Sequence, residues 1–161
     1  MTMFRIEELE AGPLLDQAVL LAMGAKRMVD PPDGVPNNVR ERWPDGGCLV
    51  LTDGPNMAFY GAAPPFSTDW GIGGPIIDRE RISVVVAVDD PVLVPGWWRA
   101  TTKFWFQGGI DGPEGSGPTA LVAAMRCYVA SKVGPTIELR QPAWNVGTPT
   151  VTQGPPPGGE G

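Results

Sequence analysis

The stretch TALVAAMRCYVASKVG, residues 119–134, decides the fold, because it is the clearest helix in the chain. Its large apolar residues recur at helical spacing, and Gly134 suits the residue at which a helix stops. We expect this helix to pack on a sheet through Leu121, Met125, Tyr128 and Val129. A second stripe on it holds only small residues, namely Ala123, Cys127 and Ala130. This stripe needs a close neighbour, either the first helix or a second copy, and it slightly favours a homodimer.

Most of the chain around this helix has the patterns of strands. RISVVVAV (81–88) is rich in β-branched residues and is the strongest strand, with WWRATTKFWF (97–106) as its antiparallel neighbour. CLVLT (48–52) and MAFYGA (57–62) flank a DGPN turn and predict a hairpin. Successive strands without helices between them predict an α+β domain with a mostly antiparallel sheet and two main helices.

The remaining segments complete one domain over residues 4–140. We expect, in chain order, a short strand at 4–9, a helix from Pro13 to Gly24, a loop at 25–46, a glycine-rich loop at 107–118 and an edge strand at 136–140. GSGPT (115–119) opens the long helix and is interpreted as its cap. Residues 141–161 are rich in Pro and Gly and predict a flexible tail.

Composition excludes several classes of function. The 161 residues carry a net charge of −6, which disfavours general binding of DNA or RNA. The chain has no histidine, so Ser-His-Asp and Cys-His catalysis and histidine-based zinc sites are excluded. Cys48 and Cys127 have no metal-ligand spacing and are expected to be buried thiols of a cytosolic protein. No apolar run is long enough to span a bilayer, and the N-terminus does not resemble a secretory signal. We expect no cofactor or metal site, and a binding protein rather than an enzyme.

The strand at 97–106 carries the first candidate site. Side chains alternate across a sheet, so one face is mostly apolar and faces the core. The other face combines two indoles, two cations and a hydroxyl, in the order Trp97, Arg99, Thr101, Lys103 and Trp105. A planar base stacks on an indole, and Arg and Lys bind phosphate, so this face suits a nucleotide. The alternative is that the tryptophans cover a helix or a subunit interface while the charges are solvated.

The second candidate site is FSTDWGIGGPIIDRERIS, residues 66–83. It places hydroxyls and a carboxylate beside an indole, offers glycine amides to a ligand and adds a positive charge, through Ser67, Thr68, Asp69, Trp70, Gly73, Gly74 and Arg79. The alternative is a glycine turn that Asp69 caps, with Trp70 buried, leading into the central strand. The glycine spacing does not match the dinucleotide-binding fingerprint.

Three segments together resemble a known family. FSTDWGIGGPIIDRERI, WWRAT and GPTALVAAMRCYVASKVG are similar to the NinX-like family of phage proteins, and the early LLDQAVLLAMG helix matches as well. The resemblance covers about residues 4–140. Ala120 stands where the family usually has a proline. The resemblance implies a phage or prophage accessory protein in the host bacterial cytoplasm, with no catalytic residues to transfer to this chain.

Two hypotheses of function follow. The first is a protein that binds a small nucleotide-derived anion without turning it over, and so sequesters a host defence signal. The second is a module that binds a host or phage protein through exposed tryptophans. A convergent pocket with Trp97, Arg99 and Lys103 favours the first, whereas a flat apolar patch favours the second.

Overall fold

The computed structural model describes residues 1–88, 91, 93–102 and 113–141. In these residues, strands form three separate antiparallel sheets, ordered β1–β8, β2–β3–β4 and β5–β6–β7, around helices α1 to α4. The expected α+β class with antiparallel pairing is therefore confirmed. The tail predicted at 141–161 lies outside the described residues except for Gln141. No helix in the described ranges is long and apolar enough to cross a membrane.

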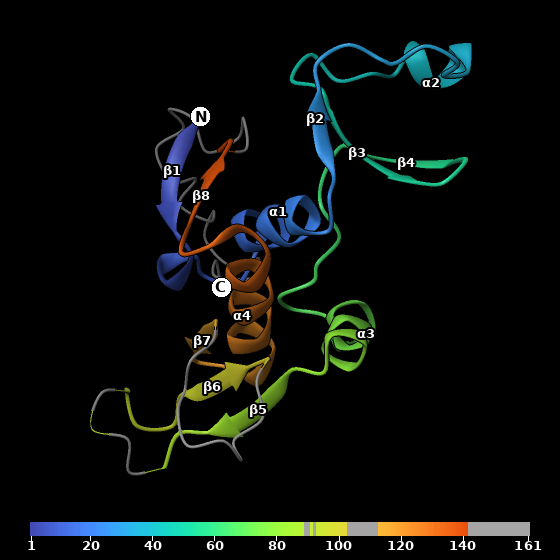
Figure 1. The fold of residues 1–161 in the computed structure, drawn as a ribbon. Coiled ribbons are helices and arrows are strands. Elements are labelled where there is room, and N and C mark those ends of the chain that lie inside the picture. Colours follow the sequence, from blue (N-terminus) through green and yellow to red (C-terminus); the bar gives the residue numbers. More distant parts are fainter. Residues whose placement is uncertain (89–90, 92, 103–112, 142–161) are drawn as a thin grey trace, which may run out of the picture.

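Helix α4 (Ala120–Val133) lies at the centre of the molecule (Figure 1). It begins where Thr119 Oγ1 accepts a hydrogen bond from Val122 N–H at 3.1 Å, and it ends at Gly134. This confirms the helix and its capping by the GSGPT segment. The helix contacts α1, α3 and strands of two sheets, so its residues from Leu121 to Val129 are all buried. Packing from every side explains why no single apolar face dominates it.

The sheet beneath α4 consists of β5 (Ser83–Val86), β6 (Trp98–Thr101) and β7 (Glu114–Gly117). The antiparallel pairing of β5 with β6 confirms the neighbours expected from the sequence. Strand β5 is shorter than the expected 81–88, and residues 103–106 of the second expected strand lie outside the described residues. Strand β7 replaces part of the glycine-rich loop expected at 107–118, so that expectation is wrong for residues 114–117. Two glycines on β7, Gly115 and Gly117, allow the sheet to approach α4 closely. This close packing explains why glycines occur in a strand here.

The small-residue stripe of α4 faces this sheet. A Cβ atom on Gly115 would lie 2.1 Å from the carbonyl oxygen of Ala123 and 2.4 Å from the amide nitrogen of Cys127. The large residue Leu121 instead packs against α3, where its Cδ1 atom lies 2.8 Å from the Cβ position of Gly73. This contact of Leu121 with α3 was not expected from the sequence. Because β7 is the close neighbour of the stripe, the stripe gives no support for a homodimer.

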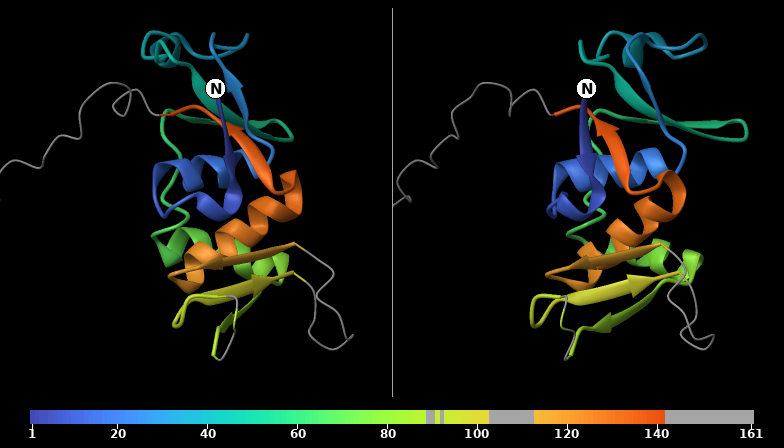
Figure 2. Two further views of the ribbon diagram at one scale, coloured as in Figure 1. Left: turned by 90° about the vertical axis from the view of Figure 1, so that its left-hand side faces the viewer. Right: turned by 60° about the vertical axis from the view of Figure 1, so that its left-hand side comes forward.

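The two ends of the domain lie together (Figure 2). Strand β1 (Thr2–Arg5) pairs with β8 (Thr136–Leu139), and the short 3₁₀ helix η1 (Ile6–Glu8) follows β1. The strand expected at 4–9 therefore ends earlier than expected, and the final strand is confirmed. Helix α1 (Pro13–Ala22) begins with proline at its first position, as expected, and Gly24 follows it with φ of +103°.

Residues 26–60 form an arm that extends from α1, away from the β5–β6–β7 sheet (Figures 1 and 2). It holds β2 (Lys26–Met28), the short helix α2 (Asn37–Arg40), β3 (Cys48–Asp53) and β4 (Asn56–Tyr60). The β3–β4 hairpin is confirmed, whereas the loop expected at 25–46 contains β2 and α2. A strand of three residues carries too little pattern to be recognised, and it exists because β3 pairs with it.

Residues Trp70–Glu80 form helix α3, where the sequence predicted a turn leading into a strand. The side chain of Asp69 caps the helix by accepting a hydrogen bond from Gly71 N–H at 2.8 Å, and this part of the expectation is confirmed. Trp70 is 57% exposed rather than buried. The helix ends at Arg81, which adopts the left-handed conformation with φ of +53°.

Candidate functional site

A cavity of about 490 Å³ lies between the start of the chain, the β6–β7 edge and α4. Arg99 on β6 lines this cavity together with Ser116, its partner on the neighbouring strand β7. Arg126 reaches it from α4 and Arg5 from β1. The structure therefore brings three arginines from distant parts of the chain to one hollow.

Arg126 is held rigidly at this cavity. Its Nε and Nη2 atoms donate hydrogen bonds to the carbonyl oxygen of Leu9 at 2.9 and 2.7 Å, and its Nη1 donates to that of Ser116 at 2.7 Å. These bonds use three of the five N–H donors of a guanidinium, so two more donors remain. Burial lowers the pKa of Arg126, while the carboxylates of Glu10 and Glu7 act in the opposite direction. Arg126 is only 5% exposed, so its charge is partly removed from water, where electrostatic interactions are stronger than in bulk solvent.

The lining of the cavity combines charge with apolar surface. Two carboxylates, Glu7 and Glu114, stand among the three arginines, and Glu7 forms an ion pair with Arg5. Apolar groups supply other parts of the wall, from Ile6, Leu93, Pro113, Ala130 and Pro135. The hollow therefore has an excess of cations in a protein whose net charge is negative. Such a lining suits a ligand with an anionic group and an apolar portion.

Ser67 lies inside the protein and joins two segments. Its N–H donates to Oδ1 of Asp16 at 2.7 Å, and its Oγ accepts from Gly12 N–H at 2.8 Å. Burial raises the pKa of Asp16, against the effect of its hydrogen bonds with Ser67. Ser67 is 2% exposed and fixes the start of α1 to the segment before α3. Its hydroxyl therefore has a structural partner.

The other predicted residues of this segment belong to α3 or to its cap. A Cβ atom on Gly73 would lie 2.2 Å from the carbonyl oxygen of Phe66, so this glycine permits close packing. Gly74 lies within the helix near the Trp70 ring, and its N–H is directed along the helix axis rather than towards a ligand. Thr68 is exposed in the turn before Asp69, where its N–H donates to the carbonyl oxygen of Pro65.

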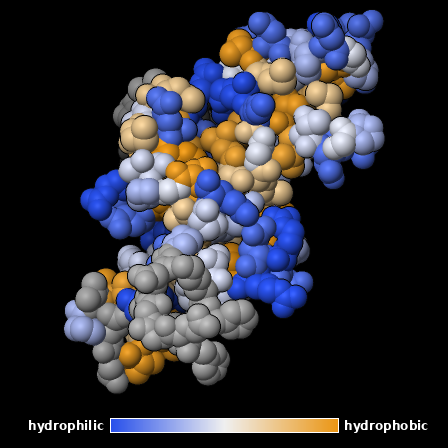
Figure 3. All heavy atoms as spheres, in the orientation of Figure 1, coloured by the Kyte–Doolittle hydropathy of each residue, from blue (hydrophilic) through white to orange (hydrophobic). Residues whose placement is uncertain are grey.

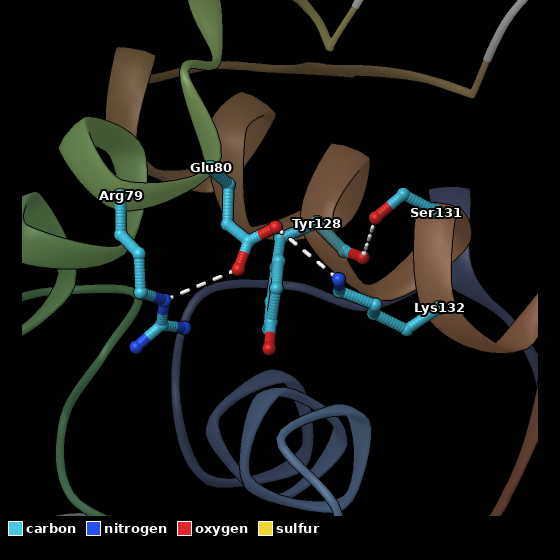
Figure 4. A network of polar contacts seen from close by, with 5 residues as sticks. All are labelled: Arg79, Glu80, Tyr128, Ser131 and Lys132. Atoms are coloured by element: carbon cyan, nitrogen blue, oxygen red, sulfur yellow. Dashed lines mark hydrogen bonds and ion pairs between the residues drawn. The ribbon is translucent and has the colours of Figure 1, made fainter.

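Arg79 takes part in a polar network that joins α3 to α4 (Figure 4). Its Nε atom donates to Oε1 of Glu80 at 3.1 Å, and Lys132 Nζ lies 3.2 Å from Oε2 of the same carboxylate. Burial raises the pKa of Glu80, but the hydrogen bonds and charges of Arg79 and Lys132 outweigh it, so that the pKa is lowered overall. The Lys132 ammonium also lies 5.7 Å from the centre of the Tyr128 ring. The surface over α3 is mostly hydrophilic (Figure 3).

The two predicted sites are thus not one site. The residues from Ser67 to Arg79 surround α3, whereas Arg99 faces the cavity with Arg126. Arg126 and Tyr128 are two residues apart on α4 and so point to nearly opposite sides of it. Trp97 is half-buried just before β6, and its carbonyl oxygen accepts a hydrogen bond from Ala87 N–H. Lys103 and Trp105 lie outside the described residues.

Sequence reasoning missed Arg126. It is the sole charged residue between Ala120 and Ser131, in an otherwise apolar and small-residue helix. A charged residue in such a place is seldom buried without partners, so it was a detectable signal. Arg5 carried no comparable signal, because only the pairing of β1 with β8 brings it near the cavity.

Metal chemistry has no evident centre in the parts of the chain that the structure describes. Within them, no group of three or more Cys, Asp or Glu side chains is arranged to hold a metal ion. Both Cys48 and Cys127 are buried free thiols, as expected. Burial raises the pKa of Cys127 to about 11, and burial also raises that of Cys48.

Comparison with known proteins assigns the chain to a family. No curated protein matches it significantly. The family model described as bacteriophage P22 NinX matches residues 8–132, which include α1, the arm, α3, the β5–β6–β7 sheet and nearly all of α4. The match covers most of the chain and agrees with the resemblance of its motifs, so the protein belongs to the NinX family of bacteriophage proteins.

Proposed function

We propose that this protein binds a small nucleotide-derived anion in the cavity beside α4 and does not turn it over. The observation that carries the proposal is that Arg99 and Arg126 line the same cavity, where Arg126 is bonded to the carbonyl oxygen of Ser116, the strand partner of Arg99. Guanidinium groups bind phosphate through pairs of directed N–H bonds. A buried and already oriented guanidinium loses little freedom when a ligand binds, which favours affinity.

The rest of the cavity suits the remainder of such a ligand. Its apolar wall can cover a base or a ribose, and the volume of about 490 Å³ is within the range of small-molecule sites. Each charge-assisted hydrogen bond contributes about 1.5–3 kcal/mol. Two such bonds together with apolar contact are consistent with micromolar affinity. In a phage protein, binding without turnover would remove a host defence signal from the bacterial cytoplasm, and this is the role we propose.

Calorimetry with cyclic and linear nucleotides and ADP-ribose derivatives tests the proposal. We expect one class to bind, and Arg99→Gln to weaken its binding about tenfold, since the loss of one charge-assisted bond amounts to at least 1.4 kcal/mol. Arg126→Lys keeps the charge but loses the fork of donors, and should weaken binding as well. Arg42→Gln removes the same charge from an exposed position on the arm and is the matched control.

Two results would count against this proposal. One is that no compound in the panel binds more tightly than about 100 μM, which is a weak affinity. The other is that Arg99→Gln and Arg42→Gln bind the same compound equally well. The cavity would then have another role.

A protein-binding module is the second candidate, and the exposure of Trp70 favours it. This indole is 57% exposed at the start of α3, although large aromatic side chains are usually more buried. Exposed tryptophans often contribute strongly to protein interfaces. Trp70→Ser should leave the fold and nucleotide binding unchanged. Loss of a purified partner's binding on that substitution, with no nucleotide binding by the unmodified protein, would favour this candidate.

A further inference from the structure

Two arginines from separate parts of the molecule converge on one carbonyl group. Arg27, on β2 of the arm, donates from Nη1 to the carbonyl oxygen of Gly46 at 3.4 Å. Arg140, which follows β8, donates from its own Nη1 to the same oxygen at 2.6 Å. The two guanidinium groups, called here the arginine pair, therefore lie next to each other where the arm meets the β1–β8 sheet.

The backbone around the arginine pair fixes its geometry. Arg140 N–H donates to Oε1 of Gln17, and Gln17 Nε2 donates to the carbonyl oxygen of Arg140, both at 3.1 Å. The absence of a side chain at Gly46 lets the Arg140 guanidinium approach closely, because a Cβ atom at this position would lie 3.1 Å from Nη1 of Arg140. The turn that holds Gly46 is closed by a 2.8 Å bond from Gly47 N–H to Pro44. Both guanidinium groups are thus directed by ordered backbone.

Within the part of the chain that the structure describes, no carboxylate balances the charges of the arginine pair. Among the described residues, neither Arg27 nor Arg140 has a carboxylate oxygen within 4.0 Å. Burial, and then the neighbouring charge of Arg140, lower the pKa of Arg27, in agreement with the repulsion expected between two adjacent cations. One neutral carbonyl oxygen shared by two cations offsets this repulsion only in part. An anion between them would remove it.

We propose that the arginine pair binds a phosphate-type oxyanion that bridges the arm to the body of the protein. Each guanidinium has five N–H donors and uses one on Gly46, so both keep donors for a tetrahedral anion. The site is distinct from the cavity, because neither arginine lines the cavity. The negative net charge disfavours a nucleic-acid backbone as the source, so the ligand class is a small phosphate or phosphate monoester.

Binding at this place has a mechanical consequence that can be measured. The anion contacts Arg27 on the arm and Arg140 on the body only when the two are docked, so it stabilises the docked state by mass action. At a phosphate concentration tenfold above the dissociation constant, opening of the arm is suppressed about tenfold. Amide hydrogen exchange reports such local opening directly. The effect should be confined to the amides of β2, β3 and β4.

The test is hydrogen exchange of the full chain with inorganic phosphate against sodium chloride of equal ionic strength. We expect phosphate to slow exchange in the arm about tenfold in the unmodified protein, and to have no such effect in Arg27→Gln or Arg140→Gln. Arg42→Gln, which removes a charge from an exposed part of the same arm, should respond like the unmodified protein.

The two outcomes that overturn the proposal are a phosphate effect that persists in Arg27→Gln, and no effect in the unmodified protein at any concentration. The Gln17–Arg140 bonds use backbone atoms of Arg140, so neither substitution removes them, and Arg27→Gln stays informative if Arg140→Gln fails to fold. Arg99→Gln should leave the response of the arm unchanged. Failure of nucleotide binding at the cavity can therefore be distinguished from failure at the arginine pair.

Discussion

Adding one methyl group at Gly115 should destabilise the protein strongly. The new Cβ atom would lie 2.1 Å from the carbonyl oxygen of Ala123 and 2.4 Å from the amide nitrogen of Cys127. Both contacts are backbone atoms of α4, which cannot move aside as a flexible side chain can. Overpacking a core costs about 1–3 kcal/mol, and a clash with backbone belongs at or above the upper end of that range.

The free energy of unfolding can be measured by urea denaturation. With a slope of about 1–3 kcal/mol per molar urea, a loss of about 3 kcal/mol lowers the midpoint by about 1–3 M. Gly61→Ala is the matched control, because nothing lies within 4 Å of the Cβ position of Gly61. Both substitutions lower the entropy of the unfolded chain equally, so this contribution cancels in the comparison.

Gly117→Ala should give an intermediate loss of stability. Its Cβ atom would lie 2.8 Å from Cγ1 of Val122, which is a side chain that can turn, and 3.2 Å from Ala123 N. The expected order of destabilisation is Gly115, then Gly117, then Gly61. If Gly115→Ala unfolds at the same urea concentration as Gly61→Ala, then β7 does not lie this close to α4, and the account of the small-residue stripe is wrong.

Three further predictions follow from ionisable groups. The pKa of Asp16 is raised in the folded protein, so its contribution to stability is present below the unfolded pKa near 3.9 and is lost as pH rises through the folded pKa. The free energy of unfolding of Asp16→Asn, measured in urea at several pH values, should therefore increase relative to that of the unmodified protein across this interval. A difference that does not change with pH would contradict this prediction. The pKa of Glu80 is lowered, so its contribution to stability has the opposite pH dependence. Glu80→Gln should lower the free energy of unfolding by up to about 1 kcal/mol at pH 7, as for exposed ion pairs, and this difference should vanish as pH falls through the folded pKa. A difference that persists at low pH would show that packing is responsible. Cys127, with its pKa raised to about 11, should react with a disulfide reagent at pH 8 only after unfolding in urea, and rapid reaction of the folded protein would show that α4 opens.

The sequence predicted the parts of the fold whose signals are local. Helix α4 combines a helical period, a Thr cap and a terminal glycine, and all three agree with its structure. The β3–β4 hairpin has a turn sequence between two apolar runs, and the pairing of β5 with β6 follows from β-branched residues. These features need no knowledge of distant residues.

Helix α3 could not be predicted in this way. It contains Gly71, Gly73, Gly74 and Pro75, all of which disfavour a helix on intrinsic propensity. Tertiary packing overrides this preference, because Gly73 fits closely beneath Phe66 and Leu121, and Ile76 is 3% exposed. The same glycines predicted a turn, since nothing in the local sequence indicates what they pack against.

Only part of the candidate site could be predicted, because sequence patterns report local structure and not contacts between distant segments. Strand alternation placed Arg99 on the face opposite the core-facing Ala100, and this holds because Ala100 is fully buried under α4. The partners of Arg99 in the cavity come from β1 and α4, which the sequence alone does not bring together. The same limit applies to the arginine pair, whose members are 113 positions apart in the chain.

The pairing of β1 with β8 also determines when the protein can fold during its synthesis. Thr2 pairs with Leu139, and the carbonyl oxygen of Leu9 is bound by the side chain of Arg126. The N-terminal elements therefore lack their partners until α4 and β8 have left the ribosome. At about 5–20 residues per second, the first residues wait for several seconds with their apolar side chains uncovered. Chaperones have this interval in which to bind the chain, whereas the β3–β4 hairpin, with its short-range contacts, can form well before it ends.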